Sequence, residues 1–268
     1  MGFLDGQTGI VTGAAVGLGR DYALALAKEG CNVAICDIRP EVMDVRKELE
    51  ALGVKALAWT ADVSVPADVR TVVDGTVAAW GRVDVLISNA GIWRGSTATD
   101  DLDKSLATYD EVIGTNLKGV YMFGRAVIPH MIAGGRSGNI INISSDHVHT
   151  HPGRPTGGGP GMDLYDASKW GVIGFTAAWA RALKEHNIRV NAMCMGATDS
   201  YMLRSFNNFK APPEVVATWM SPTEVCDLAI QIIREGPGGR TGQNIGTWVG
   251  HEIVLQPVPP AKPTHIIE

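Results

Sequence analysis

The chain has 268 residues, a formal net charge of -5 and 45% hydrophobic residues, without a basic stripe. This length suits one globular α/β domain, and the acidic balance argues against nucleic acid as a partner. No apolar run approaches the roughly 20 residues of a membrane-spanning helix, and the first residues lack a signal-peptide pattern. We therefore expect one domain over residues 1–268, in the cytoplasm, with no membrane partner. The four cysteines are expected to be reduced core residues: Cys31, Cys36, Cys194 and Cys226.

Apolar runs suited to strands alternate with helical patterns along the chain. The expected strands cover residues 7–12, 32–37, 55–60, 83–88, 138–144, 188–194 and 243–249. Gly30, Gly53 and Gly81 each follow a helical segment, where glycine readily adopts the left-handed conformation that ends a helix. This alternation predicts a doubly wound parallel sheet of seven strands, with helices on both faces and ligands at the carboxyl ends of the strands.

The first strand leads into a glycine-rich turn, Gly13 to Gly19, that opens a helix. Glycines there let the backbone approach a pyrophosphate, and the free amide groups at the helix start favour an anion. A lone glycine fingerprint is weak evidence, because such turns also occur in proteins without ligands. Here the second strand ends in Asp37, at a distance where an acid can hold a ribose diol. The sequence therefore predicts a dinucleotide site.

Tyr165 and Lys169 are four residues apart, so one helical turn brings a phenol and an ammonium to the same face. A phenol titrates near pH ~10, so a tyrosine that removes a proton at pH ~7 needs its pKa lowered by roughly three units. Lys169 is a source of positive charge that favours the phenolate. Ser145 can donate to a substrate oxygen that gains negative charge. The alternative is that Tyr165 and Lys169 are only a helix surface pair.

The spacing Thr-Gly-x-x-x-Gly-x-Gly from Thr12, together with Tyr-x-x-x-Lys, resembles the short-chain dehydrogenase/reductase family over almost the whole chain. The resemblance implies a Rossmann fold and reversible hydride transfer between a nicotinamide and a secondary alcohol or ketone. It implies that Tyr165 is the acid and base, and that Lys169 lowers the tyrosine pKa and holds the nicotinamide ribose. Ser145 would fix the substrate oxygen, and Asn116 would hold a proton-relay water.

Shorter segments resemble further motifs of that family. Asp62-Val63 is similar to the pair that contacts adenine, and Asn89-Ala90-Gly91 to the motif that supports the sheet beside the cofactor. Thr198 is expected to reach the nicotinamide carboxamide. The cofactor-binding residues that the resemblance implies are Gly13, Val16, Gly17, Leu18, Gly19, Asp37, Ile38, Asp62, Val63, Asn89, Ala90, Gly91, Tyr165, Lys169 and Thr198.

Charge indicates which nicotinamide cofactor is used. Asp37 would accept hydrogen bonds from an unmodified ribose and repel the extra phosphate of NADP. Arg20 and Arg39 are possible counterweights, because an arginine beside the ribose can receive that phosphate. Val16 and Ile38, however, occupy positions where phosphate-binding relatives usually have basic residues. NAD is the expected cofactor, and NADP is the less favoured one.

Two departures from the family pattern bear on the substrate. A glycine- and proline-rich stretch, residues 151–161, follows Ser145 and can be a lid, a subunit contact or a solvated loop. Met195-Gly196 stands where most relatives have Pro-Gly, so a flexible thioether is expected near the nicotinamide. The expected substrate loops are residues 146–164 and 197–220, and an extended tail is expected over 256–268.

His147, His149 and His151 alternate after Ser145, which suits either a zinc site or solvated loop residues. No acid or cysteine cluster completes a metal site, so we expect no metal and regard His147 as a residue that faces the substrate. Aromatic residues near the expected pocket favour a bulky apolar substrate of cyclic, aromatic, terpenoid or steroid-like type, with ordinary packing as the alternative. The candidate substrate residues are Trp93, His147, Met195, Tyr201 and Trp219.

Two other functions stay open. One is a nonredox enzyme on the same scaffold, such as a dehydratase or an epimerase. The other is an NAD-sensing regulatory protein that binds the nucleotide without turnover. In relatives of the second kind the tyrosine or the lysine is typically lost, whereas Tyr165 and Lys169 are both present here. The resemblance also implies a homotetramer or homodimer.

Overall fold

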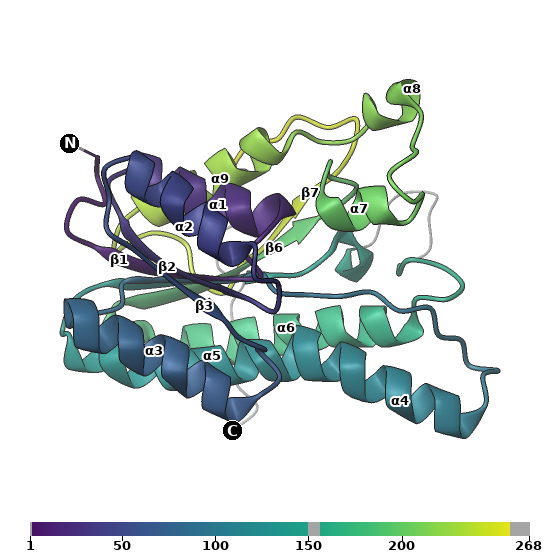
Figure 1. Cartoon of the computed structure of the whole chain (residues 1–268), viewed down its shortest axis with the longest axis horizontal. Helices are drawn as coiled ribbons and strands as arrows, with labels where there is room; N and C mark the ends of the chain where they lie inside the picture. Colours follow the sequence, from purple (N-terminus) through teal and green to yellow (C-terminus); the bar gives the residue numbers. More distant parts are fainter. Residues whose placement is uncertain (1, 150–155, 258–268) are drawn as a thin grey trace.

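The computed structural model describes residues 2–149 and 156–257, which are built around one sheet (Figure 1). Its seven strands are all parallel, in the order β3-β2-β1-β4-β5-β6-β7. The strands are β1 (Thr8–Thr12), β2 (Asn32–Asp37), β3 (Ala56–Thr60), β4 (Val85–Ser88), β5 (Gly138–Ile143), β6 (Ile188–Met195) and β7 (Asn244–Thr247). The predicted fold class is confirmed, and every strand lies within about two residues of its expected bounds.

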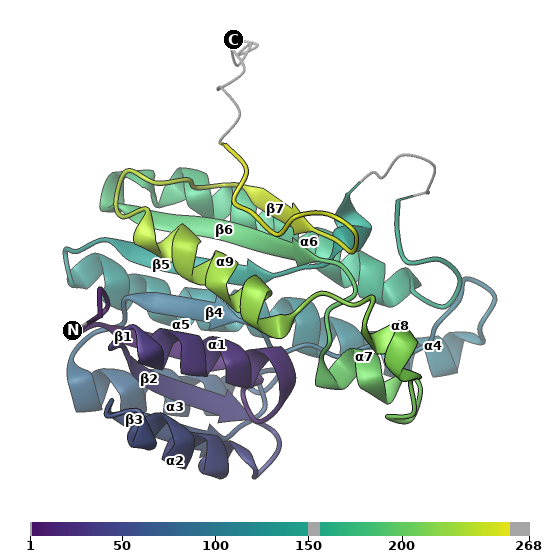
Figure 2. The ribbon, with the colours of Figure 1, turned by 90° about the horizontal axis from the view of Figure 1, so that it is seen from above.

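Helices cover both faces of this sheet (Figures 1 and 2). One face carries α1 (Gly17–Lys28), α2 (Val42–Ala51) and α9 (Pro222–Arg234). The other carries α3 (Pro66–Trp80), α5 (Gly119–Ala133) and α6 (Asp163–Ala182). Each face has its own buried core, with Leu26 and Ile233 in one and Phe123 and Val172 in the other. Because the strands are covered on both sides, they are continuous apolar runs rather than alternating patterns.

The remaining helical segments lie toward the carboxyl ends of the strands or join the longer helices (Figure 2). They are α4 (Leu102–Ile113), the π-helical turn η1 (Gly114–Lys118), the 3-10 turns η2 (Asp146–Val148) and η3 (Lys184–His186), α7 (Tyr201–Ser205) and α8 (Pro213–Val216). A ligand at the carboxyl ends of the strands would therefore be enclosed by α4 on one side and by α7 and α8 on the other.

Three glycines end helices or their last turns as expected from the sequence. Gly30, Gly53 and Gly81 have φ angles of 87°, 86° and 73°. These positive angles lie in the region that residues with a Cβ rarely adopt. The glycine positions thus fix where α1, α2 and α3 turn back toward the next strand.

The four cysteine thiols are free and buried, as the sequence indicates. Burial raises the pKa of each thiol, and for Cys194 it raises the pKa to about 12. No helix within the described ranges is both long and apolar enough to span a membrane. Residues 150–155 of the long loop, including His151, and residues 258–268 of the tail lie outside the described residues. The expected homotetramer or homodimer stays a prediction.

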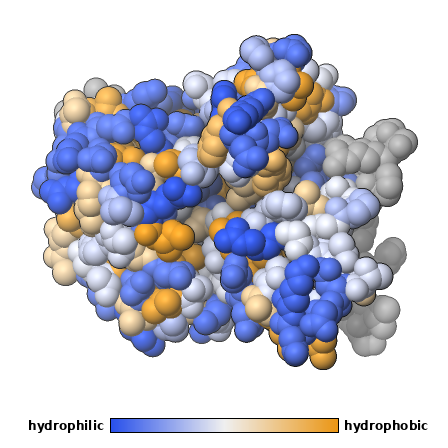
Figure 3. Space-filling model, turned by 45° about the vertical axis from the view of Figure 1, so that its right-hand side comes forward, coloured by the Kyte–Doolittle hydropathy of each residue, from blue (hydrophilic) through white to orange (hydrophobic). Residues whose placement is uncertain are grey.

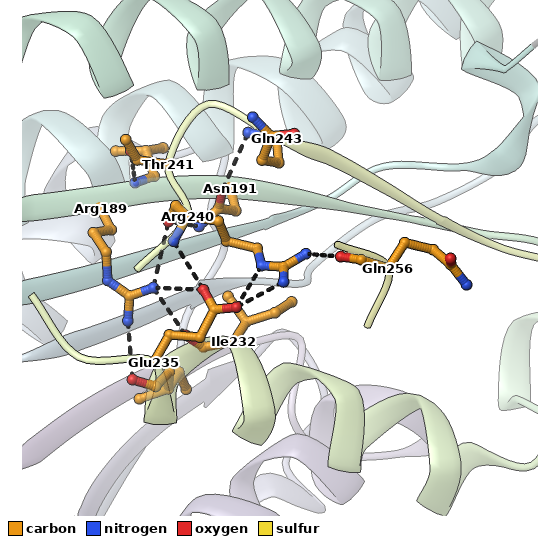
Figure 4. Close-up of polar contacts among 10 residues, drawn as sticks. Arg189, Asn191, Ile232, Glu235, Arg240, Thr241, Gln243 and Gln256 are labelled. Carbon is orange, nitrogen blue, oxygen red and sulfur yellow. Dashed lines mark hydrogen bonds and ion pairs between the residues drawn. The ribbon is translucent and has the colours of Figure 1, made fainter. Parts of the chain in front are cut away.

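A buried arginine ties β6 to the end of α9 near the amino end of β6 (Figure 4). The Arg189 side chain is 3% exposed, and its guanidinium donates to the carbonyls of Ile232 and Ile233, both at 2.9 Å. These carbonyls belong to the last turn of α9, where a positive charge opposes the negative end of the helix dipole. Arg189 therefore closes the end of α9 from a neighbouring strand.

Glu235 supplies the counter-charge in this cluster. It lies 3.6 Å from Arg189 and accepts a hydrogen bond of 2.7 Å from Arg240, which in turn donates to the Gln256 carbonyl at 2.9 Å (Figure 4). Burial opposes the charge of Glu235, but the hydrogen bonds and charge of Arg240 lower the pKa of Glu235 below its usual value. A lowered carboxyl pKa stabilises the fold above the unfolded value and loses this effect as the pH falls through the folded value.

We expect Glu235→Gln to lower the free energy of unfolding at neutral pH by about 1 to 3 kcal/mol, because two mostly buried guanidinium groups lose their counter-charge. The matched control is Glu50→Gln, which breaks an exposed pair with Arg46 and should cost less than about 0.5 kcal/mol. Urea titrations measure both variants. The loss at Glu235 should shrink as the pH falls through the range in which glutamate protonates. Equal losses from the two variants would contradict the role of this cluster.

Candidate active site

The turn after β1 forms an open anion site. Gly13 and Gly17 have positive φ angles of 66° and 58°, and a Cβ on Gly19 would overlap the carbonyl of Gly13. Helix α1 begins here without a side-chain cap and without an acidic residue in its first turn. Its first N–H groups are therefore available to a phosphate, and the helix dipole favours one. The residues present fit the pyrophosphate of a dinucleotide.

Asp37 is fixed beside this turn at the end of β2. It is 8% exposed, and its two carboxylate oxygens accept the N–H groups of Ala15 and Arg39, each at 2.9 Å. Each oxygen retains a second lone pair for a ligand hydroxyl. The structure thus holds a carboxylate where an unmodified ribose can be recognised.

Asn89 braces the glycine turn from β4. Its side-chain amide donates to the carbonyls of Thr12 and Gly13 at 3.0 and 3.1 Å. The Thr12 hydroxyl accepts the N–H groups of Asn89 and Ala90, both at 3.0 Å. Gly91 follows, and a Cβ at that position would contact the Lys169 Nζ at 3.5 Å. The Asn-Ala-Gly segment therefore links the glycine turn to the Lys169 end of the site.

Other expected cofactor residues lie along the same edge of the sheet. The Asp62 carboxylate accepts the N–H of Ser64 at 2.7 Å and so shapes the turn before α3, while Val63 is buried against Gly119. Thr198 is 4% exposed, and its hydroxyl donates to the Gly196 carbonyl at 3.1 Å. Val16 and Leu18 pack against the core under α1, and Ile38 is 63% exposed.

Lys169 ties α6 to the end of β5. It is 4% exposed, and its Nζ donates to the carbonyl of Ile143, the last residue of β5, at 2.9 Å. Ser144 reaches back, since its hydroxyl donates to the Lys169 carbonyl at 3.1 Å. The Lys169 Nζ lies 5.5 Å from the centre of the Tyr165 ring. The lysine and the tyrosine are therefore brought to one face of α6, beside the strand end that carries Ser145.

Ser145 lies at that strand end and is 4% exposed. Its hydroxyl donates to a carboxylate oxygen of Asp146 at 3.3 Å and accepts the N–H of His147 at 3.3 Å. A side-chain hydrogen bond from Ser145 acts to lower the pKa of Tyr165. The two hydroxyl groups are therefore close enough to share one ligand oxygen.

Burial governs the charge of both groups on α6. It raises the pKa of Tyr165 to about 12, with Ser145 acting in the opposite direction and Asp146 and Asp166 adding to the rise. Burial also lowers the pKa of Lys169 to about 8. The expected lowering of the Tyr165 pKa is therefore wrong for the protein by itself, because desolvation of the phenolate and the charges of Asp146 and Asp166 outweigh the hydrogen bond from Ser145.

Asn116 lies in the π-helical turn between α4 and α5 and is fully buried. Its side-chain oxygen accepts the Ile92 N–H at 2.8 Å, and its amide donates to the Ile92 carbonyl at 2.9 Å and to Ser168 at 3.1 Å. The side chain is thus occupied by the protein. The π turn around it is a backbone distortion of a kind that is frequent at functional sites.

A hydrogen-bonded pair beside Tyr165 was not expected from the sequence. The Nδ1 atom of His147 lies 2.6 Å from Oδ1 of Asp166, and Oδ2 of Asp166 accepts the N–H of Gly158 at 2.9 Å. The imidazole ring stands edge-on to the Tyr165 ring, with 5.6 Å between the centroids. The two partners are 19 residues apart in the sequence, and no local pattern indicates that they pair. That His147 faces the substrate stays a prediction.

The other candidate substrate residues do not all lie together, and two of them, Trp93 and Tyr201, belong to aromatic pairs. The Trp93 ring packs on Phe206 at 4.9 Å, and Tyr201 packs on Phe209 at 5.0 Å, so two aromatic pairs border the α7 segment. Figure 3 shows the hollow beneath the lobe that carries α7 and α8, with apolar side chains on its walls among polar ones. Trp93 and Tyr201 thus border the α7 segment, and Tyr201 also lies beside Arg39 and beside Gly17 of the glycine turn.

Met195 and Trp219 lie elsewhere. The Met195 side chain is buried in the core, where its sulfur accepts the hydroxyl of Tyr22 at 3.2 Å, so it is not the soft pocket wall that the sequence indicates. Trp219 lines a separate cavity of about 650 Å³ between the segment before α9 and residues 249–254. Within the described ranges no three His, Cys, Asp or Glu side chains gather as metal ligands.

Comparison with known proteins shows to which family the chain belongs. The model of the short chain dehydrogenases matches residues 7–211. The chain belongs to the short-chain dehydrogenase/reductase family. It is therefore an oxidoreductase of a family that binds NAD or NADP and small-molecule substrates.

Individual members of the short-chain dehydrogenase/reductase family resemble it over most of their length. A 3-oxoacyl-(acyl carrier protein) reductase of Thermotoga maritima is 36% identical, over 91% of this chain and 96% of that protein. A 2-dehydro-3-deoxy-D-gluconate 5-dehydrogenase of Escherichia coli is 36% identical over 72% of each. The crystal structure of a carveol dehydrogenase from Mycobacterium avium in complex with NAD has a TM-score of 0.81, with 25% identity over 92% of this chain and 98% of that chain.

Burial of the Lys169 charge lowers the stability of the folded protein, which can be tested. The pKa of Lys169 falls from the usual 10.5 to about 8. Between these values the unfolded chain binds more protons than the folded one, so the free energy of unfolding rises with pH there. We expect Lys169→Met to raise the free energy of unfolding at neutral pH by up to about 2 kcal/mol, after the loss of the bond to Ile143. The variant should also lose the rise in stability above pH 8.

Thermal and urea unfolding across this pH range measure the effect, and Lys184→Met, at an exposed lysine in η3, is the matched control. A clear loss of stability in Lys169→Met alone at neutral pH would show that the buried ammonium stabilises the fold instead.

Proposed function

We propose that this protein is an NAD-dependent oxidoreductase that interconverts a secondary alcohol and a ketone. The observation that carries the proposal is the arrangement of Ser145, Tyr165 and Lys169 at the end of β5, beside an open glycine turn for a dinucleotide. A phenol, a hydroxyl and an ammonium within one buried site form a proton-transfer set, because they can bind and protonate one ligand oxygen.

The proposed roles follow from these contacts. Tyr165 takes the hydroxyl proton of the alcohol during oxidation and returns it during reduction. Ser145 donates to the same oxygen, which requires its hydroxyl to turn from Asp146. Lys169 donates hydrogen bonds to the ribose hydroxyls of the nicotinamide, and its positive charge favours the Tyr165 phenolate. Asn116 positions a water that links Lys169 to solvent. The bound nicotinamide supplies the hydride acceptor and, when oxidised, a positive charge.

The high pKa of Tyr165 shapes this mechanism. With its proton held by burial, Tyr165 is ready to donate to a ketone oxygen, which is the reductive direction. The oxidative direction needs the phenolate, and only positive charge beside the ring lowers that cost. Lys169, 5.5 Å from the ring centre, contributes in the fraction of molecules in which it is charged. The overall oxidation also releases a proton, so it should be favoured at alkaline pH, whereas reduction, which consumes one, should be favoured near neutrality.

The arginine contacts support NAD over NADP. Arg20 forms a salt bridge with Glu48, and the Arg39 guanidinium lies over the Tyr201 ring at 4.6 Å. Both cations are therefore already engaged, whereas the Asp37 carboxylate is held beside the glycine turn, where the ribose of a bound dinucleotide would lie. The extra phosphate of NADP would be repelled by that negative charge.

We expect the protein to use NAD with a kcat/KM at least about tenfold higher than with NADP, a difference of about 1.4 kcal/mol. Asp37→Asn keeps the size of the side chain and one of the two oxygens that accept the loop amides, but it removes the charge. It should reduce the preference for NAD by about tenfold, mainly through a lower KM for NADP. Steady-state rates with both cofactors test this, and a parent protein that prefers NADP would refute the assignment.

The aromatic pairs on the α7 side support a bulky, largely apolar substrate. Trp93 with Phe206 and Tyr201 with Phe209 offer flat apolar surface near the carboxyl ends of the strands. Ring systems of cyclic, aromatic, terpenoid or steroid-like alcohols would bury such surface, and each buried ring adds affinity in proportion to the apolar area removed from water.

Tyr165→Phe should reduce turnover by at least about 10²-fold while NAD binding stays nearly intact, because the variant loses only the proton-transferring hydroxyl. Formation of reduced nicotinamide, followed by absorbance with a panel of cyclic secondary alcohols, measures turnover, and calorimetry measures binding. Near-normal activity in the variant would remove Tyr165 from the mechanism. Turnover of a substrate without net reduction of NAD would favour a dehydratase or epimerase, and NAD binding without turnover of any alcohol would favour a sensing protein.

A further inference from the structure

The pair formed by His147 and Asp166 is not needed for the proton transfer described above. Its side chains are mostly buried, with exposed fractions of 16% and 21%, and they stand next to the Tyr165 ring. The glycine segment after residue 156 packs directly on the pair, since a Cβ on Gly158 would lie 2.6 Å from His147 Nδ1. Only a residue without a side chain fits there. The imidazole is therefore clamped from two sides and held in one orientation.

Asp166 determines which nitrogen of the imidazole carries a proton. Its carboxylate can only accept a hydrogen bond, so the contact of 2.6 Å at Nδ1 places the proton of the neutral ring on Nδ1. The other nitrogen, Nε2, then presents a lone pair. It has no hydrogen-bond partner among the described residues, and it is not one of the fully buried polar atoms, so it is accessible to a ligand. A ligand hydroxyl can therefore donate to it.

The free nitrogen lies close to the reacting groups. One oxygen of Asp146 is 3.9 Å from Nε2 of His147 and 3.3 Å from the hydroxyl of Ser145. Nε2 and the Ser145 hydroxyl therefore flank the same carboxylate oxygen. A ligand whose reacting oxygen binds at Ser145 and Tyr165 would place atoms that are one or two carbons further along within reach of Nε2.

The charges around the imidazole limit what can bind there. Asp146 lies on η2 and Asp166 on α6, and among the described residues of the facing elements the cation is Lys169, which is held at the Ile143 carbonyl. The Asp166 carboxylate and the Nε2 lone pair are both hydrogen-bond acceptors. They favour a ligand with an O–H donor over one with a carboxylate.

We propose that Nε2 of His147, oriented by Asp166, accepts a hydrogen bond from a second hydroxyl of the substrate, so that the preferred substrates are cyclic diols with this hydroxyl one or two carbons from the reacting carbinol. This inference rests on the proposed alcohol oxidation. It means that the substrate ring, otherwise apolar, carries a second polar group. His147 is then a specificity residue that contacts the substrate, and Asp166 is a positioning residue.

The test compares kcat/KM for cis-1,2-cyclohexanediol and cyclohexanol with NAD under the same conditions. The parent should prefer the diol by at least tenfold. His147→Leu should reduce this ratio by about tenfold, because the second hydroxyl then loses its acceptor. His147→Gln should restore part of the ratio, since its amide oxygen can accept the same hydrogen bond. Asp166→Asn should reduce the ratio by severalfold, because the imidazole is then free to carry its proton on Nε2.

The control is His186→Leu, at an exposed histidine in η3, which should leave the ratio unchanged. An equal ratio in the parent and in His147→Leu would overturn the inference while leaving the proposed oxidation of cyclohexanol in place. A parent that prefers a cyclic hydroxy acid to the diol would also overturn it, since Nε2 would then be a donor. Failure of the parent to oxidise either alcohol would contradict the inference and the proposed function together.

Discussion

Lys169 reaches from α6 to the carbonyl of Ile143, and Ser144 reaches back to the carbonyl of Lys169. This reciprocal tie fixes α6 against the end of β5, and the rest of the site depends on it. Tyr165, one turn before the lysine, and Ser145, one residue after Ser144, are held in register by the same two bonds. A substitution that loosened either bond would move the phenol relative to the serine and so weaken both contacts to the ligand oxygen.

Much of the fold and the cofactor half of the site could be predicted from the sequence because they depend on local patterns. Strand positions follow from apolar runs, helix ends from Gly30, Gly53 and Gly81, and the dinucleotide turn from glycines whose positive φ angles leave little choice of residue. Asp37 could be placed because it is the last residue of a strand, and the carboxyl ends of parallel strands share one edge of the sheet.

The rest depends on contacts between distant segments. His147 and Asp166 are 19 residues apart in the sequence, and buried Met195 contacts Tyr22, a residue of α1. The Tyr165 pKa is raised, whereas the sequence predicts that it is lowered. The spacing of four residues reveals the nearby lysine but not how deeply both groups are buried. The π-helical turn at Asn116 likewise has no periodic signal that distinguishes it from the helices on either side.

The burial of all four thiols has a consequence for following the motions of this molecule. Cys31 directly precedes β2, Cys36 lies on β2, Cys194 on β6 and Cys226 on α9, so the set samples both halves of the sheet and one covering helix. A thiol that is buried and protonated does not react with an alkylating reagent until its segment opens. The rate of labelling at each cysteine would therefore report how often that part of the structure opens, without any added probe.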